Sequence, residues 1–400
     1  MDSADPRALA DFQALLTPAG QELLHAAEAL NPREETYLRD LAALQRAAHA
    51  SPRLGRAALE IAILRREAGR KFADAGRLYF TRPALEQASP QEVSQYRSQR
   101  YRGFAHLLDL GCSVGSDTLA LARLAPAAGV DLDPLRLLMA RANCAAQPAS
   151  FLRADLTAPL PFAASDLALF FDPARRAENR RAFSIEHYTP PLRIIQSWLP
   201  RCPALGVKIS PGVDLDELRD YACEVEFISL HGELKEAALW FGRLHSGAPR
   251  RATLLPGPHT LVAPARPPAS SLADAPQAFL YEPDAAVLRA GLVTTLAEQL
   301  EARQLDADIA YLTAERQTPT PFGRGWAVED WFPFQLKRLR AYLRQRGVQR
   351  VTVKKRGSPI APEALIRDLR LNAAEGLERT LFLTHLHGQP IVIIALPQPL

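Results

Sequence analysis

The chain has few cysteines and no long apolar run. Its 400 residues include four widely spaced cysteines with no Cys-x-x-Cys pair: Cys112, Cys144, Cys202 and Cys223. We therefore expect reduced thiols, with no disulfide framework and no metal site, and the nine histidines form no cluster with metal-ligand spacing. No apolar run reaches the roughly 20 residues of a membrane-spanning helix, and the N-terminus lacks the basic and then apolar order of a signal peptide. The sequence thus predicts a cytoplasmic protein that needs neither membrane nor metal, and no segment indicates a protein partner.

Positive charge is concentrated near the C-terminus. The chain carries a formal net charge of +4, with 48% hydrophobic and 23% charged residues, as ordinary globular proteins do. Residues 331–371 hold eleven cationic and two acidic side chains, a net +9, so the remainder carries −5. This asymmetry predicts a cationic C-terminal module on a mildly acidic body. The alternative is that these charges only solvate a helix surface.

The pattern along the chain predicts four regions. Residues 1–78 carry apolar side chains at spacings of three and four, which predicts a module of helices with one buried face. Residues 79–255 alternate between strands and helices, and we interpret them as the core domain. Residues 256–330 begin rich in proline and small residues, as a linker and accessory segment would, and residues 331–400 form the basic domain. The lead-in near Pro83 either covers a ligand or only begins a helix.

Acidic residues end three successive predicted strands. Asp109 closes LLD, Asp131 closes GVD and Asp155 follows FLRA, while Gly111 and Gly115 shape the turn after the first strand. Glycine lets the backbone turn sharply and leaves room for a ligand. Because ligands of parallel α/β sheets bind at the carboxyl ends of the strands, this order predicts a nucleotide-type ligand, with Asp131 on ribose hydroxyls. The alternative is that these are ordinary turn and cap residues.

The three strand ends resemble the cofactor motifs of a known family. Asp109–Gly115 is similar to motif I of class I S-adenosylmethionine-dependent methyltransferases, many of which have glycine where Ser113 stands. Gly129–Asp133 resembles motif II, and Arg153–Leu156 resembles motif III. With FFDPARR, VKISPG, GELKEAALWFG and VKKRG, the chain resembles bacterial methyltransferases with a C-terminal THUMP-like domain, over roughly residues 75–395.

This resemblance implies a fold, a cofactor and a partner. The fold would be α/β: a Rossmann-like class I methyltransferase sheet, parallel with a terminal antiparallel hairpin, with an N-terminal helical module and a C-terminal α+β THUMP-like domain. The cofactor would be S-adenosyl-L-methionine, held by Asp109, Gly111, Cys112, Gly115, Asp131, Leu132, Asp155 and Leu156. The partner would be RNA, as tRNA or another structured RNA, bound by cationic residues such as Lys337, Lys354, Lys355 and Arg356.

The pair Asp172-Pro173 is the candidate catalytic element. It resembles motif IV, Asp/Asn-Pro-Pro-aromatic, of amino-group methyltransferases, but Ala174 and Arg175 replace the second proline and the aromatic residue. A carboxylate and a main-chain carbonyl after a rigid proline accept both N–H bonds of an exocyclic amine, and so direct its lone pair toward the methyl group. Arg175 or Arg176 would stack on the base or contact phosphate.

These observations predict a methyltransferase that acts on a base nitrogen of structured RNA. Two alternatives remain open. One is the same chemistry on a protein or small molecule, and the other is a protein that binds cofactor or RNA without turnover, because motif IV is altered. Lys208, Tyr188 and the pair Pro190-Pro191 are further candidates for the edge of the substrate pocket.

Overall fold

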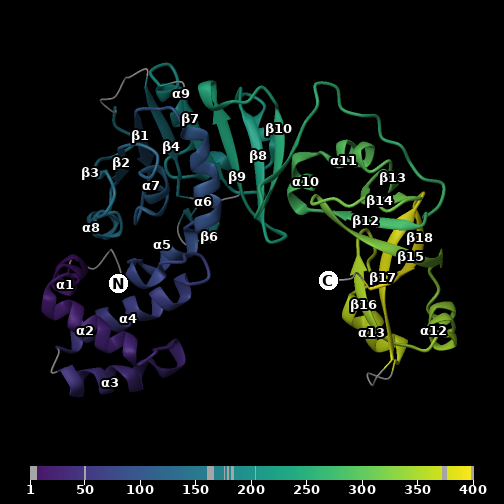
Figure 1. Cartoon of the computed structure of the whole chain (residues 1–400), viewed down its shortest axis with the longest axis horizontal. Coiled ribbons are helices and arrows are strands. Elements are labelled where there is room, and N and C mark those ends of the chain that lie inside the picture. Colours follow the sequence, from purple (N-terminus) through teal and green to yellow (C-terminus); the bar gives the residue numbers. More distant parts are fainter. Residues whose placement is uncertain are drawn as a thin grey trace. The chain divides into compact units, whose positions relative to one another are not determined.

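The chain forms two compact units (Figure 1). Unit 1 comprises Met1–Glu224 and Lys235–Gly247, and unit 2 comprises Val225–Leu234 and Ala248–Leu400. The structure, a computed structural model, describes residues 7–48, 51–159, 166–174, 176–177, 180–181, 184–202, 204–371 and 376–397. Within these ranges, no helix combines the length and the apolar character that crossing a membrane requires.

Unit 1 begins with four helices: α1 (Ala8–Leu15), α2 (Pro18–Ala29), α3 (Tyr37–Ala48) and α4 (Pro52–Ala68). Pro18 separates α1 from α2, because it has no N–H to continue α1 and instead begins α2, with Thr17 as its N-cap. Phe12 of α1 is fully buried in a cluster that includes Met139 of α8 (Pro134–Asn143). The N-terminal helices therefore pack on the domain that follows them.

The sheet of unit 1 consists of β1 (His106–Leu110), β2 (Ala127–Asp131), β3 (Ala149–Arg153), β4 (Leu167–Phe171), β7 (Leu205–Ile209) and β9 (Glu233–Phe241). The strand order is β9-β7-β4-β1-β2-β3. All neighbours pair in parallel except β9, which runs antiparallel to β7. The predicted parallel sheet with an antiparallel end is confirmed. Its accompanying elements are α5 (Arg82–Gln87), α6 (Gln91–Ser98), α7 (Ser116–Leu121), α9 (Ile195–Trp198) and the small hairpin β5 (Arg176–Ala177) and β6 (Arg180–Arg181).

An aromatic cluster fixes the middle of this sheet. The ring of Tyr101 meets Phe170 of β4 and Trp240 of β9 edge-on, at centroid distances of 6.5 and 6.0 Å. The Tyr101 hydroxyl donates to the carbonyl of Leu169 at 3.2 Å. A Cβ atom at Gly206 would lie 2.2 Å from this hydroxyl, so only glycine fits on β7 beneath the ring. Such close packing fixes the positions of β4 and β7 relative to each other, and the ends of these two strands carry residues of the candidate site.

Unit 2 contains a three-stranded part, β8 (Glu224–Leu230), β10 (Arg250–Leu255) and β11 (His259–Val262), in which β8 and β10 are parallel and β10 and β11 form a hairpin. It also contains a seven-stranded sheet of β12 (Phe279–Pro283), β13 (Arg303–Asp306), β14 (Ile309–Ala314), β15 (Gly323–Pro333), β16 (Val348–Lys355), β17 (Leu377–Leu386) and β18 (Gln389–Ala395). The order of this sheet is β13-β14-β12-β15-β18-β17-β16. Four helices accompany these strands: α10 (Ala285–Ala290), α11 (Val293–Gln299), α12 (Leu336–Gln345) and α13 (Pro362–Leu369).

The seven-stranded sheet has a hydrophobic core on each face. Leu339 of α12 and Leu365 of α13 belong to one buried cluster, whereas Tyr311, Trp326 and Phe382 belong to the other. The sheet takes strands from both sides of residue 330, where composition and charge predict a domain boundary, and that position lies inside β15. Strands that are distant in sequence join through main-chain hydrogen bonds, which a change in composition does not reveal.

Candidate active site

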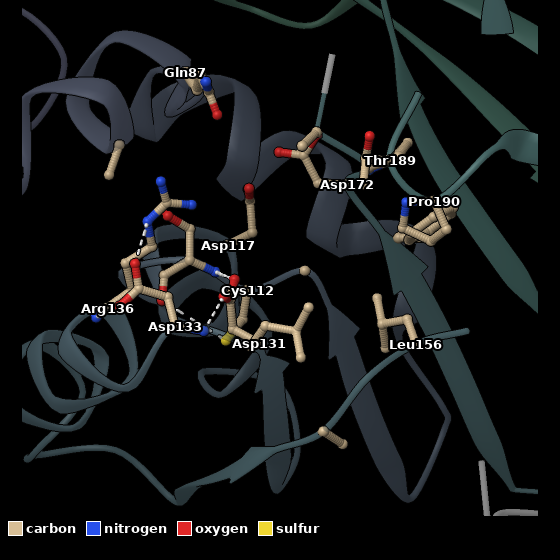
Figure 2. A pocket seen from close by; sticks show the side chains of 18 of the residues that line it. Gln87, Cys112, Asp117, Asp131, Asp133, Arg136, Leu156, Asp172, Thr189 and Pro190 are labelled. Carbon is tan, nitrogen blue, oxygen red and sulfur yellow. Dashed lines mark hydrogen bonds and ion pairs between the residues drawn. The ribbon is translucent and has the colours of Figure 1, made fainter. Parts of the chain in front are cut away.

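A pocket of about 330 Å³ lies in unit 1 at the carboxyl ends of β1, β2, β3 and β4 (Figure 2). It is lined by the loops after these strands, by α5 and by the segment around Thr189 and Pro190. Figure 2 shows Asp131 near Asp133 on one side of the pocket, whereas Asp172 lies near Thr189 on another. The strand ends that the sequence predicts to bind a ligand thus meet in one cavity.

The turn after β1 needs glycine at its first position. Gly111 has φ +82°, and a Cβ atom there would lie 2.6 Å from the main-chain oxygen of Asp172. Ser113 takes φ +49°, in the left-handed region that glycine favours at this place in the family motif. Gly115 has φ +78° and packs against Ala140 of α8, where a Cβ would come within 3.0 Å of the alanine Cβ. Gly111 therefore lines the pocket, whereas Gly115 joins α7 to α8 and does not.

Asp131 is held rigidly at the tip of β2. Its Oδ2 accepts the N–H of Ser113 and its Oδ1 accepts the N–H of Asp133, each at 2.9 Å. Leu132 beside it exposes 56% of its surface and lines the pocket. Asp133 caps α8 by accepting from the N–H groups of the next turn, Leu135 at 2.9 Å and Arg136 at 3.2 Å. Asp131 therefore presents a fixed carboxylate to the pocket, with an apolar neighbour.

The tip of β3 contributes a second acidic and apolar pair. Asp155 is exposed and accepts from both the N–H and the hydroxyl of Thr157, and these two hydrogen bonds hold the pKa of Asp155 below its usual value. Leu156 is buried and lines the same cavity. Cys112 also lines the cavity, but burial raises the pKa of its thiol, so the sulfur is a small packing group rather than a nucleophile. Among the described residues, no group of His, Cys, Asp and Glu side chains is arranged to hold a metal ion.

Asp109 does not line the pocket. It is fully buried at the end of β1, where its Oδ2 accepts the hydroxyl of Thr118 at 2.5 Å and its Oδ1 has no hydrogen-bond partner among the described residues. Burial, followed by the nearby charge of Asp117, raises the pKa of Asp109 to about 8. This shift favours the protonated form of Asp109, which supports the turn from beneath. The family motif predicts that Asp109 binds the cofactor, whereas the structure gives it this internal position.

We expect Asp109→Asn to change how stability depends on pH. In the wild type, the unfolded chain loses the Asp109 proton near pH 4 and the folded chain keeps it to about pH 8. Native stability should therefore fall by about 1.4 kcal/mol per pH unit between these values because of this group alone. The asparagine variant has no such proton to lose. Its free energy of unfolding relative to that of the wild type, measured by urea denaturation, should therefore rise from pH 5 to pH 8. Parallel stability curves would show that Asp109 is ionised in the fold.

A buried ion network lies between the pocket and the sheet. Arg97 of α6 forms ion pairs with Asp117 at the start of α7 and Glu236 of β9, and its guanidinium lies 4.4 Å from the Phe170 ring centroid. Burial alone would lower the pKa of Arg97, but the two carboxylates outweigh it and raise the pKa. Burial likewise acts to raise the pKa of Asp117, whereas Arg97 brings it below the usual value. Asp117 lines the pocket as a charge that Arg97 compensates.

Asp172 at the end of β4 is paired with a buried lysine. The Nζ of Lys208 on β7 donates to Asp172 Oδ2 at 2.7 Å and to the main-chain oxygen of Gln87 at 3.1 Å. The Lys208 side chain is only 3% exposed, and that of Asp172 is 23% exposed. Lys208 thus orients the carboxylate and links it to α5. The sequence placed Lys208 only at the edge of the substrate pocket, because nothing in its spacing reveals this partner.

The loop after Pro173 closes one wall of the pocket. The N–H and C=O groups of Ala174 pair with those of Thr189 at 3.0 and 2.9 Å. Tyr188 is buried, and its hydroxyl accepts the N–H of Ser210 at 3.2 Å. Pro173 itself is buried and lines the cavity. Two predicted substrate residues cannot be placed in this wall: Arg175 lies outside the described residues, and Arg176 is described only by its backbone in β5.

Helix α5 forms a further wall. Its residues Ala84 and Gln87 line the pocket. The Nζ of Lys71 donates to the carbonyls at the C-terminal end of this helix, at 2.8 Å for Leu85, 3.1 Å for Glu86 and 2.9 Å for Ala88. The lead-in therefore begins a helix near Pro83, and this helix also lines the pocket.

Sequence similarity to two known proteins shows the family of this chain. Two uncharacterised S-adenosylmethionine-dependent methyltransferases of Mycobacterium tuberculosis, from strains CDC 1551 / Oshkosh and ATCC 25618 / H37Rv, are each 35% identical to it over 332 residues, which are 80% of this chain and 90% of theirs. The chain belongs to the S-adenosylmethionine-dependent methyltransferases. The crystal structure of a candidate methyltransferase from Porphyromonas gingivalis W83 has the same fold, with a TM-score of 0.75 and 22% identity, covering 95% of this chain and 99% of that one.

Two segments of the methyltransferase also match families of domains. A family described as THUMP domain-like matches residues 323–397, and a domain of unknown function matches residues 5–68. The predicted enzyme class, fold and C-terminal THUMP-like domain are confirmed. Its cofactor is S-adenosylmethionine, and the pocket fits this molecule. The fixed carboxylate of Asp131 suits hydroxyl donors, and the apolar groups of Leu132 and Leu156 suit a flat ring.

The predicted RNA-binding residues lie in unit 2 of the methyltransferase. Lys337 is exposed on α12, and Lys355 is exposed on β16. Lys354 forms an ion pair with Glu282 and also lies 4.9 Å from the Trp326 ring centroid, so part of its charge is used within the fold. The fourth predicted residue, Arg356, follows β16 and lines a second cavity together with Arg324.

Proposed function

We propose that this methyltransferase modifies a base nitrogen of structured RNA, such as tRNA, in the cytoplasm where such RNA is found. The observation that carries the proposal is the position of Asp172-Pro173 in the cofactor pocket, with Asp172 paired to Lys208. The THUMP domain-like match to residues 323–397 supports RNA as the substrate class, together with the net charge of +9 over residues 331–371.

On the cofactor side, we assign Asp131 to the ribose hydroxyls and Leu132 with Leu156 to the adenine ring. Asp155 lies at the rim of the same end of the pocket. S-adenosylmethionine, when bound, supplies an electrophilic methyl group on a sulfonium centre. The remaining work of the protein is to position the two partners and to exclude water, which α5 and the Ala174–Thr189 wall support.

On the substrate side, Asp172 accepts an N–H bond of the amine. A base amine is a poor nucleophile because its lone pair is delocalised into the ring, and a fixed acceptor turns that lone pair toward the methyl carbon. The same carboxylate stabilises the positive charge that develops on nitrogen. Lys208 acts as a positioning residue, because it holds Oδ2 of Asp172 at 2.7 Å from the side away from solvent. Pro173 restrains the adjoining backbone.

We expect Asp131→Ala to weaken S-adenosylmethionine binding by about 1–3 kcal/mol, or about 5- to 150-fold, because buried hydroxyl donors lose their acceptor. Isothermal titration calorimetry measures this effect directly. Asp166→Ala, at an exposed acid before β4, is the matched control and should bind like the wild type. Equal affinities of the Asp131 variant and this control would remove Asp131 from the ribose site.

The proposed substrate is tested by mass spectrometry of nucleosides. RNA from a strain that lacks this gene should lose one methylated nucleoside, and the wild-type gene should restore it. A gene that carries Asp172→Ala should not restore it. An unchanged nucleoside profile, together with methyl transfer by the purified enzyme to a protein or small-molecule fraction, would assign the same chemistry to another substrate.

A further inference from the structure

We propose that a second cavity, in unit 2, is a binding site for a backbone phosphate of the substrate RNA. The inference rests on RNA being the substrate and adds a specific contact to it. The cavity has a volume of about 500 Å³ and lies among the β10–β11 hairpin, the start of α10, the start of β15 and the end of β16. Its positively charged lining residues are Arg324, Lys354 and Arg356.

Arg324 is placed in the cavity by strand register. It stands opposite Glu282 where β15 pairs with β12, next to Gly323, at which a Cβ would lie 2.8 Å from the Glu282 carbonyl. Its Nη2 comes within 3.4 Å of the position that a Cβ would take at Gly232, so the guanidinium lies over the turn between β8 and β9. Arg324 precedes residue 331, where the basic segment begins, and so a count of charge along that segment does not include it.

Arg356 reaches the same cavity from the end of β16, the edge strand of the sheet. Its N–H donates to the carbonyl of Leu383 at 3.0 Å, and its guanidinium lies 5.4 Å from the Tyr311 ring centroid. The next residue, Gly357, has φ +82°, a backbone conformation that residues with a side chain rarely adopt. This tight turn fixes the direction in which the chain leaves β16, and with it the position of Arg356.

Each acidic group of the cavity has a partner within the fold. Glu282 forms an ion pair with Lys354. Asp284 accepts the hydroxyl of Ser229 at 2.5 Å and the N–H of Ala286 at 2.8 Å, which caps α10. Among the described residues, neither Arg324 nor Arg356 has an ion-pair partner. Arg324, Lys354 and Arg356 together outnumber the carboxylates of Glu282 and Asp284, so the cavity lining keeps a net positive charge of one, with both guanidinium groups outside any ion pair of the described residues.

The two arginines of the cavity have the chemistry that suits a phosphate group. A guanidinium offers paired N–H donors that suit phosphate oxygens, and its charge does not depend on pH in the physiological range. The wall also contains His259 and Pro256. A phosphodiester of bound RNA and free inorganic phosphate share this chemistry, and the experiment below separates them.

The test is the salt dependence of binding to bulk tRNA. The slope of log K against log[salt] reports the number of phosphates that the protein neutralises, and removing one of these interactions reduces the slope by about 0.7–0.9. We expect Arg324→Gln and Arg356→Gln each to reduce the slope by about this amount and to weaken binding several-fold at 0.1 M salt. Arg356→Lys should retain most of the slope. The matched control is Arg303→Gln, at an exposed position of β13 that does not line the cavity, and it should leave the slope unchanged.

The outcomes separate this inference from the proposed function. Suppose that the wild type binds tRNA in a salt-dependent way. An unchanged slope in both glutamine variants, or a loss of slope in Arg303→Gln equal to theirs, would then overturn the phosphate site alone. Absence of salt-dependent tRNA binding by the wild type would overturn RNA as the substrate, and this contact with it. Competition with inorganic phosphate separates the two ligands. If phosphate displaces tRNA no better than the same concentration of chloride, the RNA backbone is the ligand. If phosphate displaces tRNA selectively, at a much lower concentration than chloride, free phosphate is the ligand.

Discussion

Asp172→Ala is expected to lower kcat for methyl transfer by about 10²- to 10³-fold, with the affinity for S-adenosylmethionine changed less than about threefold. The size follows from removing one preorganised group that stabilises charge in the transition state. The cofactor affinity should hold because the groups assigned to the cofactor, led by Asp131, lie on other strand ends. Single-turnover rates and calorimetry with the same preparations measure the two quantities.

A second substitution shows what Asp172 does. Asp172→Asn keeps one acceptor oxygen, so if the role is to orient the amine, this variant should lose only about tenfold in kcat. If Asp172 must take the proton as a general base, the asparagine and alanine variants should be equally slow. Retention of wild-type kcat by Asp172→Ala would remove the residue from the reaction.

Lys208 supplies the control for this experiment. Alanine at position 172 leaves the Lys208 ammonium buried without its partner, which by itself costs stability. Lys208→Met should restore the stability of Asp172→Ala without restoring kcat. By itself, Lys208→Met should lower kcat with little change in KM, and it should have no further effect on kcat in the Asp172→Ala background, because it acts through that carboxylate.

The strand ends could be predicted because they obey local rules. A glycine with positive φ and an acid at the end of a strand are visible in the sequence, and both Gly111 and Asp131 lie where those rules placed them. Asp109 obeys the same pattern but serves the interior. Its environment depends on Thr118 of α7, and whether a strand-end acid faces the ligand or a helix is decided by packing.

The charges inside unit 1 could not be predicted for a related reason. Arg97 pairs with Asp117 and Glu236, which lie 20 and 139 residues away, and Lys208 pairs with Asp172 at a separation of 36 residues. No spacing rule joins such residues, because the sheet brings them together. In unit 2, counting charge along the sequence located the basic segment but passed over Arg324, which joins Arg356 only through the fold.

Arg97→Met is expected to destabilise the protein by about 3–5 kcal/mol, because it leaves the buried carboxylates of Asp117 and Glu236 without their counter-charge. For a unit of this size, the melting temperature should fall by about 6–20 °C. Arg102→Met, at an exposed arginine nearby, is the control and should change stability by no more than about 0.5 kcal/mol.

The pH dependence of the Arg97 variant separates lost charge from lost packing. Without Arg97, the two buried carboxylates gain stability by taking up protons, so their pKa values should rise above those of the unfolded chain. The variant should therefore recover stability relative to the wild type as the pH falls from 8 to 5. A cavity left by the missing guanidinium would cost the same at every pH. A constant difference in the melting temperature across this range, measured by calorimetry, would mean that Arg97 acts through its packing on Phe170 and not through the ion network.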